Sequence, residues 1–239
     1  MTRIEVFPSN KGKESHPFIA WFITCLLIVL CVWASHWQYS RGVTRHHRNA
    51  IISSHVNLPT AQLDDVSSNP LAAEWQKVET QGTFSPNDQI LLRNKYFDGK
   101  YGFELLTLFH ASGGKNFWVN RGWVAPGTSA STQPKLPLTS TQPQTIQGRL
   151  RLDHSLPQGS FFAISNNGGE LIVKWNAQKN TKTEDFYLDL LTTSEAEMKP
   201  SAPVGLPELT DGPHMAYALQ WLFFGGLVLY GRFLLRRSR

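Results

Sequence analysis

The stretch DGPHMAYALQWLFFGG, residues 211–226, places polar and aromatic side chains at the start of an apolar run. If the run is helical, one face carries a stripe of five residues: His214, Tyr217, Ala218, Trp221 and Gly225. Imidazole is a common ligand of metals and haem iron, and aromatic walls suit a flat apolar ring. The stripe indicates either a ligand site at the mouth of a membrane span or an interfacial cap whose aromatic residues form a bilayer belt.

Depth along the helix bears on this choice. At about 1.5 Å per residue, Trp221 lies about 10 Å deeper than His214, below the level where a belt residue is needed. Gln220 at that depth is unexpected unless it faces protein or a cofactor. The cap is the simpler interpretation of the stretch, whereas Trp221 and Gln220 favour a site.

A second polar set, HWQYSR, residues 36–41, ends the first apolar run. Trp37 and Arg41 are four residues apart and share a helix face, and an interfacial tryptophan with a phosphate-level arginine explains both. The functional alternative is that Gln38 and Arg41 face a ligand carboxylate or a partner. His36 stands at about the height of His214, so these two imidazoles could also share a metal or a haem.

The segment VNRGWV, residues 119–124, places Asn120 and Arg121 in an otherwise apolar strand, where neighbours point to opposite faces. A charge there must be paired or must serve a functional face. Pairing of Arg121 with Glu104 across the ASGG hairpin and a functional role are equally favoured.

Several other chemistries find no support in the sequence. It has no GxSxG, HExxH, phosphate-loop, CxxC or CxxCH motif. Cys25 and Cys31 both lie in the first apolar run, about 240° apart on a helix, which is poor geometry for one copper ion. The sequence therefore offers no catalytic set, and we expect no copper site and two thiols that serve as small apolar filler.

Two apolar runs, residues 18–35 and 215–235, approach the ~20 residues that span a hydrocarbon core. The C-terminal flank carries four arginines: Arg232, Arg236, Arg237 and Arg239. They place that end in the cytoplasm, and with two spans the middle of the chain is exported. An uncleaved anchor is favoured over a signal peptide, because the first run is longer than a usual apolar core. The predicted division is a cytoplasmic tail 1–17, a span 18–37, an exported domain 38–213, a span 214–235 and a cytoplasmic tail 236–239.

Charge and composition agree with this layout. Lys and Arg outnumber Asp and Glu by 23 to 18, and the basic residues gather at the ends and just after the first run. That distribution indicates membrane topology and excludes a nucleic-acid footprint. The exported part contains neither cysteine, so it has no disulfide.

The middle of the chain reads as short strands separated by turns. The predicted strands are 75–84, 89–94, 101–110, 115–124, 145–152, 170–175 and 185–191. Their spacing predicts a mostly antiparallel barrel or sandwich-like domain. Residues 41–63 are expected to form a helix that carries the chain from the membrane, 127–143 a polar loop, and 199–213 an extended linker.

In these features the chain resembles the Surfeit locus protein 1 family, the Shy-type assembly factors for cytochrome c oxidase. The shared motifs, which occur in the family's order, are WQ with an arginine three residues on (37, 38 and 41), GFxLLT (102–107), VNRGWV (119–124) and HxxYAxQW (214–221). Two positions depart from the pattern: Ser35 stands where the family usually has glycine, and His36 where it has a small or apolar residue. His36 is therefore no family ligand.

The resemblance implies a non-enzymatic role in maturing the catalytic subunit of a haem–copper oxidase, through delivery or insertion of haem a. It implies His214 as the haem ligand. The chemistry of haem, an apolar ring with two propionates, fits this site: Tyr217 and Trp221 would form a wall, and Arg41 or Arg121 would bind a propionate. Partners would be the catalytic subunit, the haem a synthesis machinery and the lipid bilayer. The location would be a bacterial inner membrane, or the mitochondrial inner membrane in a eukaryote. The alternative is a cofactor-free scaffold for the immature oxidase subunit.

Overall fold

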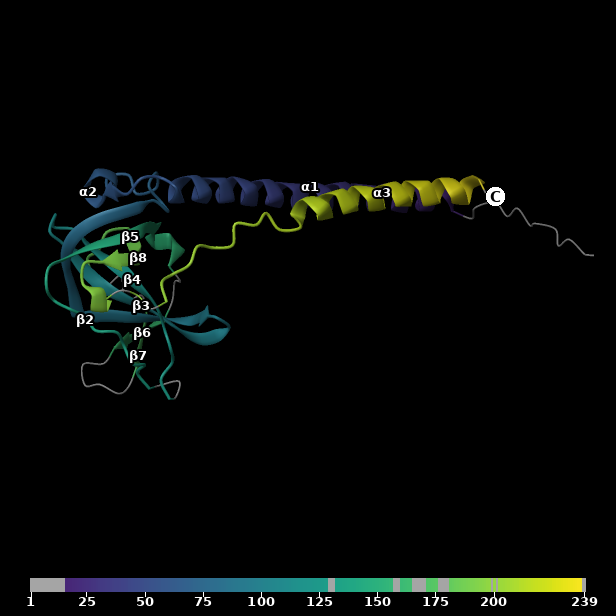
Figure 1. The fold of residues 1–239 in the computed structure, drawn as a ribbon. Coiled ribbons are helices and arrows are strands. Elements are labelled where there is room, and N and C mark those ends of the chain that lie inside the picture. The colour runs from purple at the N-terminus through teal and green to yellow at the C-terminus, as the bar shows by residue number, and fades with distance from the viewer. Residues whose placement is uncertain are drawn as a thin grey trace, which may run out of the picture. The chain divides into compact units, whose positions relative to one another are not determined.

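The computed structural model describes residues 16–128, 132–156, 160–164, 171–175, 181–198, 200 and 202–237. The chain divides into two compact units (Figure 1), a helical unit of residues 1–50 and 209–239 and a β-rich unit of residues 51–208. Of the predicted segments, most of the N-terminal tail, a few residues of the 127–143 loop and the last two residues lie outside the described residues.

The helical unit contains α1 (Pro17–Val56) and α3 (His214–Arg237), which lie side by side in Figure 1. Both are long and apolar enough to cross a membrane. The 40 residues of α1 span about 60 Å, twice the ~30 Å of a hydrocarbon core. The apolar run therefore fills only the first half of α1. The expected helix over 41–63 is confirmed as far as Val56, continuous with the run before it.

Small residues bring the two helices together. Ser35 Oγ donates a hydrogen bond of 2.8 Å to the carbonyl of Ala218, and both residues are buried. A Cβ added to Gly225 would lie 3.3 Å from the Cβ of Cys31, so the backbones approach closely there. Cys31 is buried at this contact and Cys25 is exposed, so the two thiols have different surroundings, as their spacing predicts.

Among its described residues, the β-rich unit holds eight strands and short helical turns. The strands are β1 (Ala61–Gln62), β2 (Lys77–Phe97), β3 (Lys100–Ala111), β4 (Asn116–Val124), β5 (Gln144–Leu152), β6 (Ser160–Ile164), β7 (Leu171–Trp175) and β8 (Phe186–Thr193). The described helical turns include α2 (Leu63–Val66) and the 3-10 turns Asp153–Ser155 and Ala196–Met198.

The strands form one mixed sheet. Antiparallel pairs join β2 with β3, β3 with β4, β5 with β8 and β2 with β5, while β4 and β8 are parallel. These pairings return to β2, but β6 and β7 extend from it, and among the described residues β7 pairs only with β6. The mostly antiparallel character is confirmed, but the sheet is mixed and does not form a closed barrel.

The long β2 corrects one predicted turn. The sequence predicts two strands, 75–84 and 89–94, separated by a turn at Ser-Pro-Asn-Asp. In the structure both segments continue along the same partner β3, and the register shifts between Phe84 and Gln89. Ser85 Oγ bonds Asp88 Oδ2 at 2.6 Å within this bulge. A bulge accommodates the proline, which has no N–H to donate, without reversing the strand.

A row of phenylalanine rings forms the centre of the core. Phe84, Phe109, Phe117 and Phe186 come from β2, β3, β4 and β8, and successive ring centroids are 4.9, 5.5 and 5.4 Å apart. The parallel register of β4 and β8 sets Phe117 beside Phe186. The row ties four strands together through edge and tilted ring contacts as well as burial.

We expect Phe117→Ala to lower the free energy of unfolding by about 3–5 kcal/mol, because its fully buried ring leaves a cavity between two others. The control is Leu71→Ala, a side chain that is 69% exposed, with an expected change within about 0.5 kcal/mol. Equilibrium denaturation of the full chain in mild detergent, followed by near-ultraviolet circular dichroism, measures both. Equal losses in the two variants would show that the phenylalanine row is not the centre of stability.

Candidate functional site

The first residue of α3 is held by α1. His214 Nδ1 lies 2.9 Å from Gln38 Oε1, and both side chains are half-buried. A carbonyl oxygen only accepts hydrogen bonds, so Nδ1 carries the proton and donates it. The lone pair of the neutral ring is then on Nε2. A glutamine that fixes the tautomer in this way is what a histidine ligand requires of its neighbour.

The remaining motif residues flank this contact. At 3.6 residues per turn, Tyr217 and Trp221 lie beside the face of α3 that carries Ala218, on the same side as His214. Their side chains are exposed, and 37% of the Trp221 side chain is accessible. The centroids of the Trp221 and Phe224 rings lie 5.8 Å apart in an edge-to-face arrangement. These rings are available to a ligand or to lipid beside the imidazole.

On α1 the arginine and tryptophan of the motif form a pair of their own. The Arg41 guanidinium lies 5.4 Å from the centre of the Trp37 ring, and both side chains are exposed. At 3.6 residues per turn, Trp37 lies largely on the face of α1 that points away from α3. Gln220 likewise lies largely on the face of α3 that points away from α1. Neither is brought to His214 within this unit, and their part in a site stays a prediction.

His36 lies on the other flank of the helix pair. There a groove of about 410 Å³ is lined by His36 and seven neighbours: Val32, Ser35, Tyr39, Met215, Ala218, Leu219 and Leu222. The structure therefore does not bring His36 to the imidazole of His214. Among the described residues there is no group of three or more His, Cys, Asp or Glu side chains that could hold a metal ion.

A clamp that the sequence did not reveal holds the segment before α3. Asp211 Oδ2 lies 2.8 Å from His46 Nδ1, and Asp211 Oδ1 accepts a 3.0 Å hydrogen bond from Asn49. The hydrogen bond from His46, with the charge of nearby Arg45, lowers the pKa of Asp211 below its usual range. His214 is thus positioned from two levels of α1. The only signal in the sequence was a lone acid before the apolar run.

Arg121 belongs to the β-rich unit, in β4. Its guanidinium donates to Thr139 Oγ1 and to the Leu138 carbonyl, and lies 5.6 Å from the Phe84 ring centre. Burial lowers the pKa of Arg121 to about 10. Arg121 also lines a cavity of about 440 Å³ whose other basic residue is Lys135.

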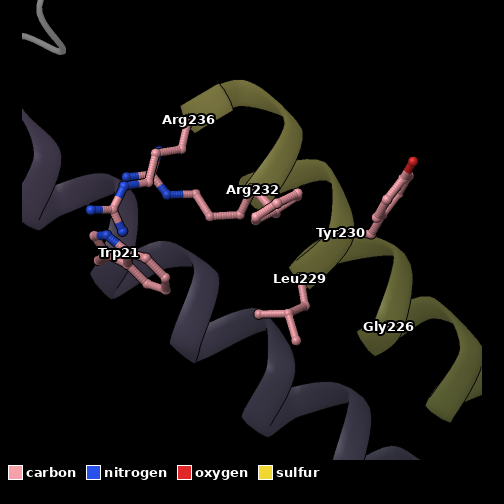
Figure 2. Close-up of a pocket in the computed structure, with 7 residues that line it drawn as sticks. Trp21, Gly226, Leu229, Tyr230, Arg232 and Arg236 are labelled. Atoms are coloured by element: carbon pink, nitrogen blue, oxygen red, sulfur yellow. The ribbon is translucent and has the colours of Figure 1, made fainter. Parts of the chain in front are cut away.

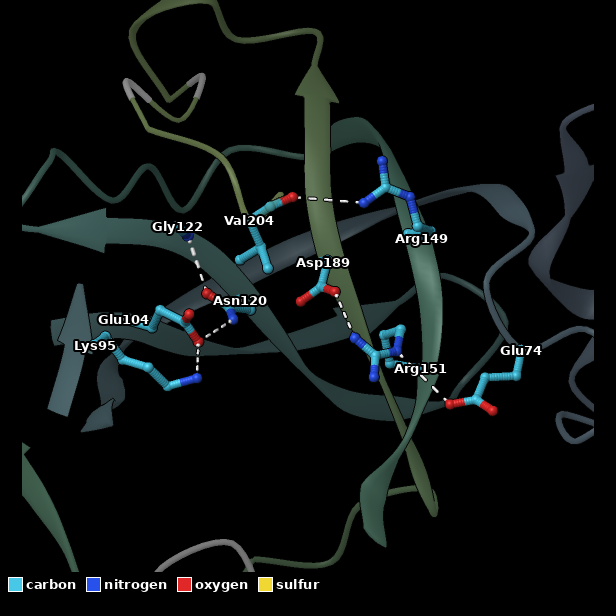
Figure 3. A network of polar contacts seen from close by, with 9 residues as sticks. All are labelled: Glu74, Lys95, Glu104, Asn120, Gly122, Arg149, Arg151, Asp189 and Val204. Carbon is cyan, nitrogen blue, oxygen red and sulfur yellow. Dashed lines mark hydrogen bonds and ion pairs between the residues drawn. The ribbon is translucent and has the colours of Figure 1, made fainter. Parts of the chain in front are cut away.

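The alternative that Arg121 pairs with Glu104 is wrong. Glu104 Oε2 instead accepts 2.9 Å contacts from Lys95 and from Asn120 (Figure 3). The reason is the pleat, because adjacent residues of a strand point to opposite faces and Asn120 shares the face of Glu104.

Two further motif residues have structural roles. Gly122 has φ +93°, and a Cβ there would lie 2.3 Å from the carbonyl oxygen of Ala202, which accepts a 2.9 Å hydrogen bond from Trp123 N. Gly102 lies against the indole of the same Trp123, and a Cβ added to Gly102 would lie 2.4 Å from that ring. Only glycine fits at either position. The GFxLLT and VNRGWV motifs therefore form one packing unit.

A buried polar network crosses β5 and β8 (Figure 3). Arg151 lies 3.3 Å from Asp189 and 3.7 Å from Glu74, with its guanidinium 3.5 Å from the centre of the Trp75 ring. Burial raises the pKa of Asp189, which is 1% exposed, to about 6, although Arg151 acts in the opposite direction. A single acid in an apolar strand was its only sequence signal.

In chain order the protein has one long apolar helix, a mostly antiparallel sheet and a second apolar helix, and this layout defines its class. The model of the SURF1 family matches residues 25–226. The chain therefore belongs to the SURF1 family, and the resemblance seen in its motifs is confirmed. It is similar to uncharacterised SURF1-like proteins of Mycobacterium bovis and Mycobacterium tuberculosis, each 27% identical over 228 residues, covering 88% of this chain and 81% of the relative.

We expect Asp189→Asn to remove a contribution to the free energy of unfolding that is present at acidic pH, where the Asp189 carboxyl of the folded protein is protonated. With a folded pKa near 6 and an unfolded value near 3.8, the folded state holds the proton more tightly, so unfolding free energy falls as pH rises from about 4 to 6. The slope from one such group reaches about 1.4 kcal/mol per pH unit. Melting temperatures of the full chain between pH 4 and 7 measure this slope.

The Asn variant should show a flatter profile than the wild type over pH 4–6. The matched control is the exposed Asp65→Asn, which should keep the wild-type slope. Parallel profiles for the wild type and the Asp189 variant would contradict protonation of that carboxyl in the folded state.

Proposed function

We propose that this chain is a membrane-anchored assembly factor for haem–copper cytochrome c oxidase, and not an enzyme. Membership of the SURF1 family supports this role. Both apolar helices would cross a bacterial inner membrane, or the mitochondrial inner membrane, with the termini in the cytoplasm or matrix and residues 38–213 on the outer side. The arginines of the last turn of α3 support this orientation.

The cargo we propose is haem a, taken up transiently at the outer end of the helix pair. The observation that carries the proposal is the hydrogen bond between His214 Nδ1 and Gln38, which leaves Nε2 of the imidazole as the ligating atom. Haem iron accepts such a nitrogen from neutral histidine. The half-buried position of His214, beside two exposed aromatic rings, fits a large apolar cargo.

The other side chains at this end have complementary tasks. Tyr217 and Trp221 would cover the face of the ring, and Arg41 would bind a propionate through a charge-assisted hydrogen bond. We give that task to Arg41 rather than Arg121, because Arg121 already donates to Thr139 and Leu138 within the β-rich unit. Loading from the haem a synthesis machinery and transfer to the oxidase catalytic subunit would follow. No copper ion takes part in this proposal.

The competing function is a cofactor-free scaffold that holds the immature catalytic subunit. It is favoured by the exposed aromatic side chains of α3, which would then pack on a partner span. The two functions predict the same oxidase defect when the protein is lost, so a spectrum decides between them. Wild-type protein purified from cells that make haem a should show a Soret band if haem is carried.

We expect His214→Ala to abolish that Soret band, because it removes the iron ligand. The control is His36→Ala, an imidazole at the same end of the helix pair but on the other flank, which should retain the wild-type haem stoichiometry. Gln38→Leu should lower haem affinity by about 10–100-fold, because the ring loses the acceptor that fixes its tautomer.

A Soret band of unchanged position and intensity in His214→Ala would sink the ligand assignment. If wild-type protein made alongside haem a shows no band at all, the scaffold is the better account. Both variants are to be compared with the wild type by size-exclusion chromatography, so that a folding defect is not taken for loss of a ligand.

A further inference from the structure

A second cavity of the helix pair lies at the end opposite His214. It has a volume of about 470 Å³ and is bounded by Trp21 near the start of α1 and by the last turns of α3 (Figure 2). Its walls are apolar and aromatic, contributed by Trp21, Leu229, Tyr230 and Phe233, and its charged residues are Arg232 and Arg236. These residues belong neither to the four family motifs nor to the proposed haem site.

Arg232 is placed differently from an ordinary surface charge, whereas Arg236 is exposed. Arg232 is only 7% exposed, and its guanidinium lies 5.2 Å from the centre of the Trp21 ring on the neighbouring helix. Figure 2 shows the side chain of Arg236, one turn further on, reaching toward the same tryptophan. A snorkelling arginine extends away from the bilayer into water, whereas Arg232 extends across to α1.

The position along the helix identifies the environment. Arg232 follows His214 by 18 residues, or about 27 Å of helix, close to the ~30 Å thickness of a hydrocarbon core. If the His214 end is at one membrane surface, Arg232 and Arg236 are therefore at the phosphate level of the other. In the proposed orientation that surface is the cytoplasmic or matrix leaflet, which carries anionic lipids.

We propose that this cavity is a binding site for one anionic phospholipid, with its phosphate on Arg232 and Arg236 and its upper acyl chain against Leu229, Tyr230 and Phe233. The planar fork of arginine binds phosphate oxygens in a bidentate manner, and Trp21 holds the fork of Arg232 in place. The site rests on the proposed membrane placement of α1 and α3 but not on haem binding.

The two halves of the cavity select the ligand. Two adjacent cations favour a headgroup with net negative charge over a zwitterionic one, which brings its own ammonium group. The apolar wall favours a lipid over free phosphate, because inorganic phosphate would leave Leu229, Tyr230 and Phe233 uncovered.

The test uses the full chain in mild detergent, with phosphatidylglycerol and phosphatidylcholine as separate probes. Native mass spectrometry after extensive washing measures the lipid retained per protein. We expect the wild type to retain phosphatidylglycerol several-fold better than phosphatidylcholine. Arg236→Gln should lower phosphatidylglycerol retention by about tenfold, the effect of one charge-assisted hydrogen bond. This exposed side chain is removed without disturbing the fold.

The matched control is Arg237→Gln, which removes the same charge from the same turn but outside the cavity lining. It should retain phosphatidylglycerol like the wild type, and Arg232→Lys should retain an intermediate amount. Equal losses in the Arg236 and Arg237 variants, or equal retention of the two lipids by the wild type, would overturn the site. Displacement by millimolar inorganic phosphate would also overturn it, as a simple anion site.

Loss of lipid binding and loss of haem binding are separable. His214→Ala should keep phosphatidylglycerol retention at the wild-type level, and Arg236→Gln should keep the Soret band. If retention fails in both variants while the Soret band fails only in the first, the lipid proposal is wrong and the haem proposal stands.

Discussion

The close approach of α1 and α3 is the contact on which the features of the helical unit depend. It is made by residues with little or no side chain at Ala218 and Gly225, and by a hydroxyl at Ser35 that is satisfied across the interface. Apolar burial drives helix association only weakly inside a bilayer, so close packing and a satisfied polar group matter more there. At one end of the helix pair Gln38 reaches His214, and at the other end Trp21, Arg232 and Arg236 line the cavity.

This contact also accounts for a departure from the family pattern. A glycine at position 35 would permit close approach but would leave the carbonyl of Ala218 with its helical hydrogen bond alone. The serine hydroxyl adds a second bond to that carbonyl at 2.8 Å and still fits the interface. The exchange is therefore compatible with the packing, and it makes the first turn of α3 more firmly attached to α1.

Much of the architecture could be predicted from the sequence, because periodicity and turn residues are local signals. The two apolar helices, the hairpin between β3 and β4 and the family motifs were all legible in this way. The parallel pairing of β4 with β8 was not, because it joins segments about 70 residues apart. The bulge in β2 was mistaken for a turn, since Ser-Pro-Asn-Asp is typical of both.

The candidate site was predictable only as a set of residues. Helical spacing placed His214 and Tyr217 on one side, but it could not show that Gln38 is the acceptor for the imidazole or that Asp211 is held by His46. Arg121 illustrates the limit most clearly. Its charge suggested a ligand-binding role or an ion pair with an acidic residue. It donates instead to the Thr139 hydroxyl and the Leu138 carbonyl, 18 and 17 residues further along the chain.

The positive φ of Gly122 and its contact with the Ala202 carbonyl have a consequence for any variant of this residue. Any side chain there would meet the carbonyl of Ala202 and force the segment that leads toward α3 to move. A substitution at position 122 would thus destabilise the β-rich unit without removing any polar or charged side chain. On this view a substitution of Gly122 in the VNRGWV motif causes a defect of folding, and stabilising substitutions elsewhere in the sheet would compensate for it.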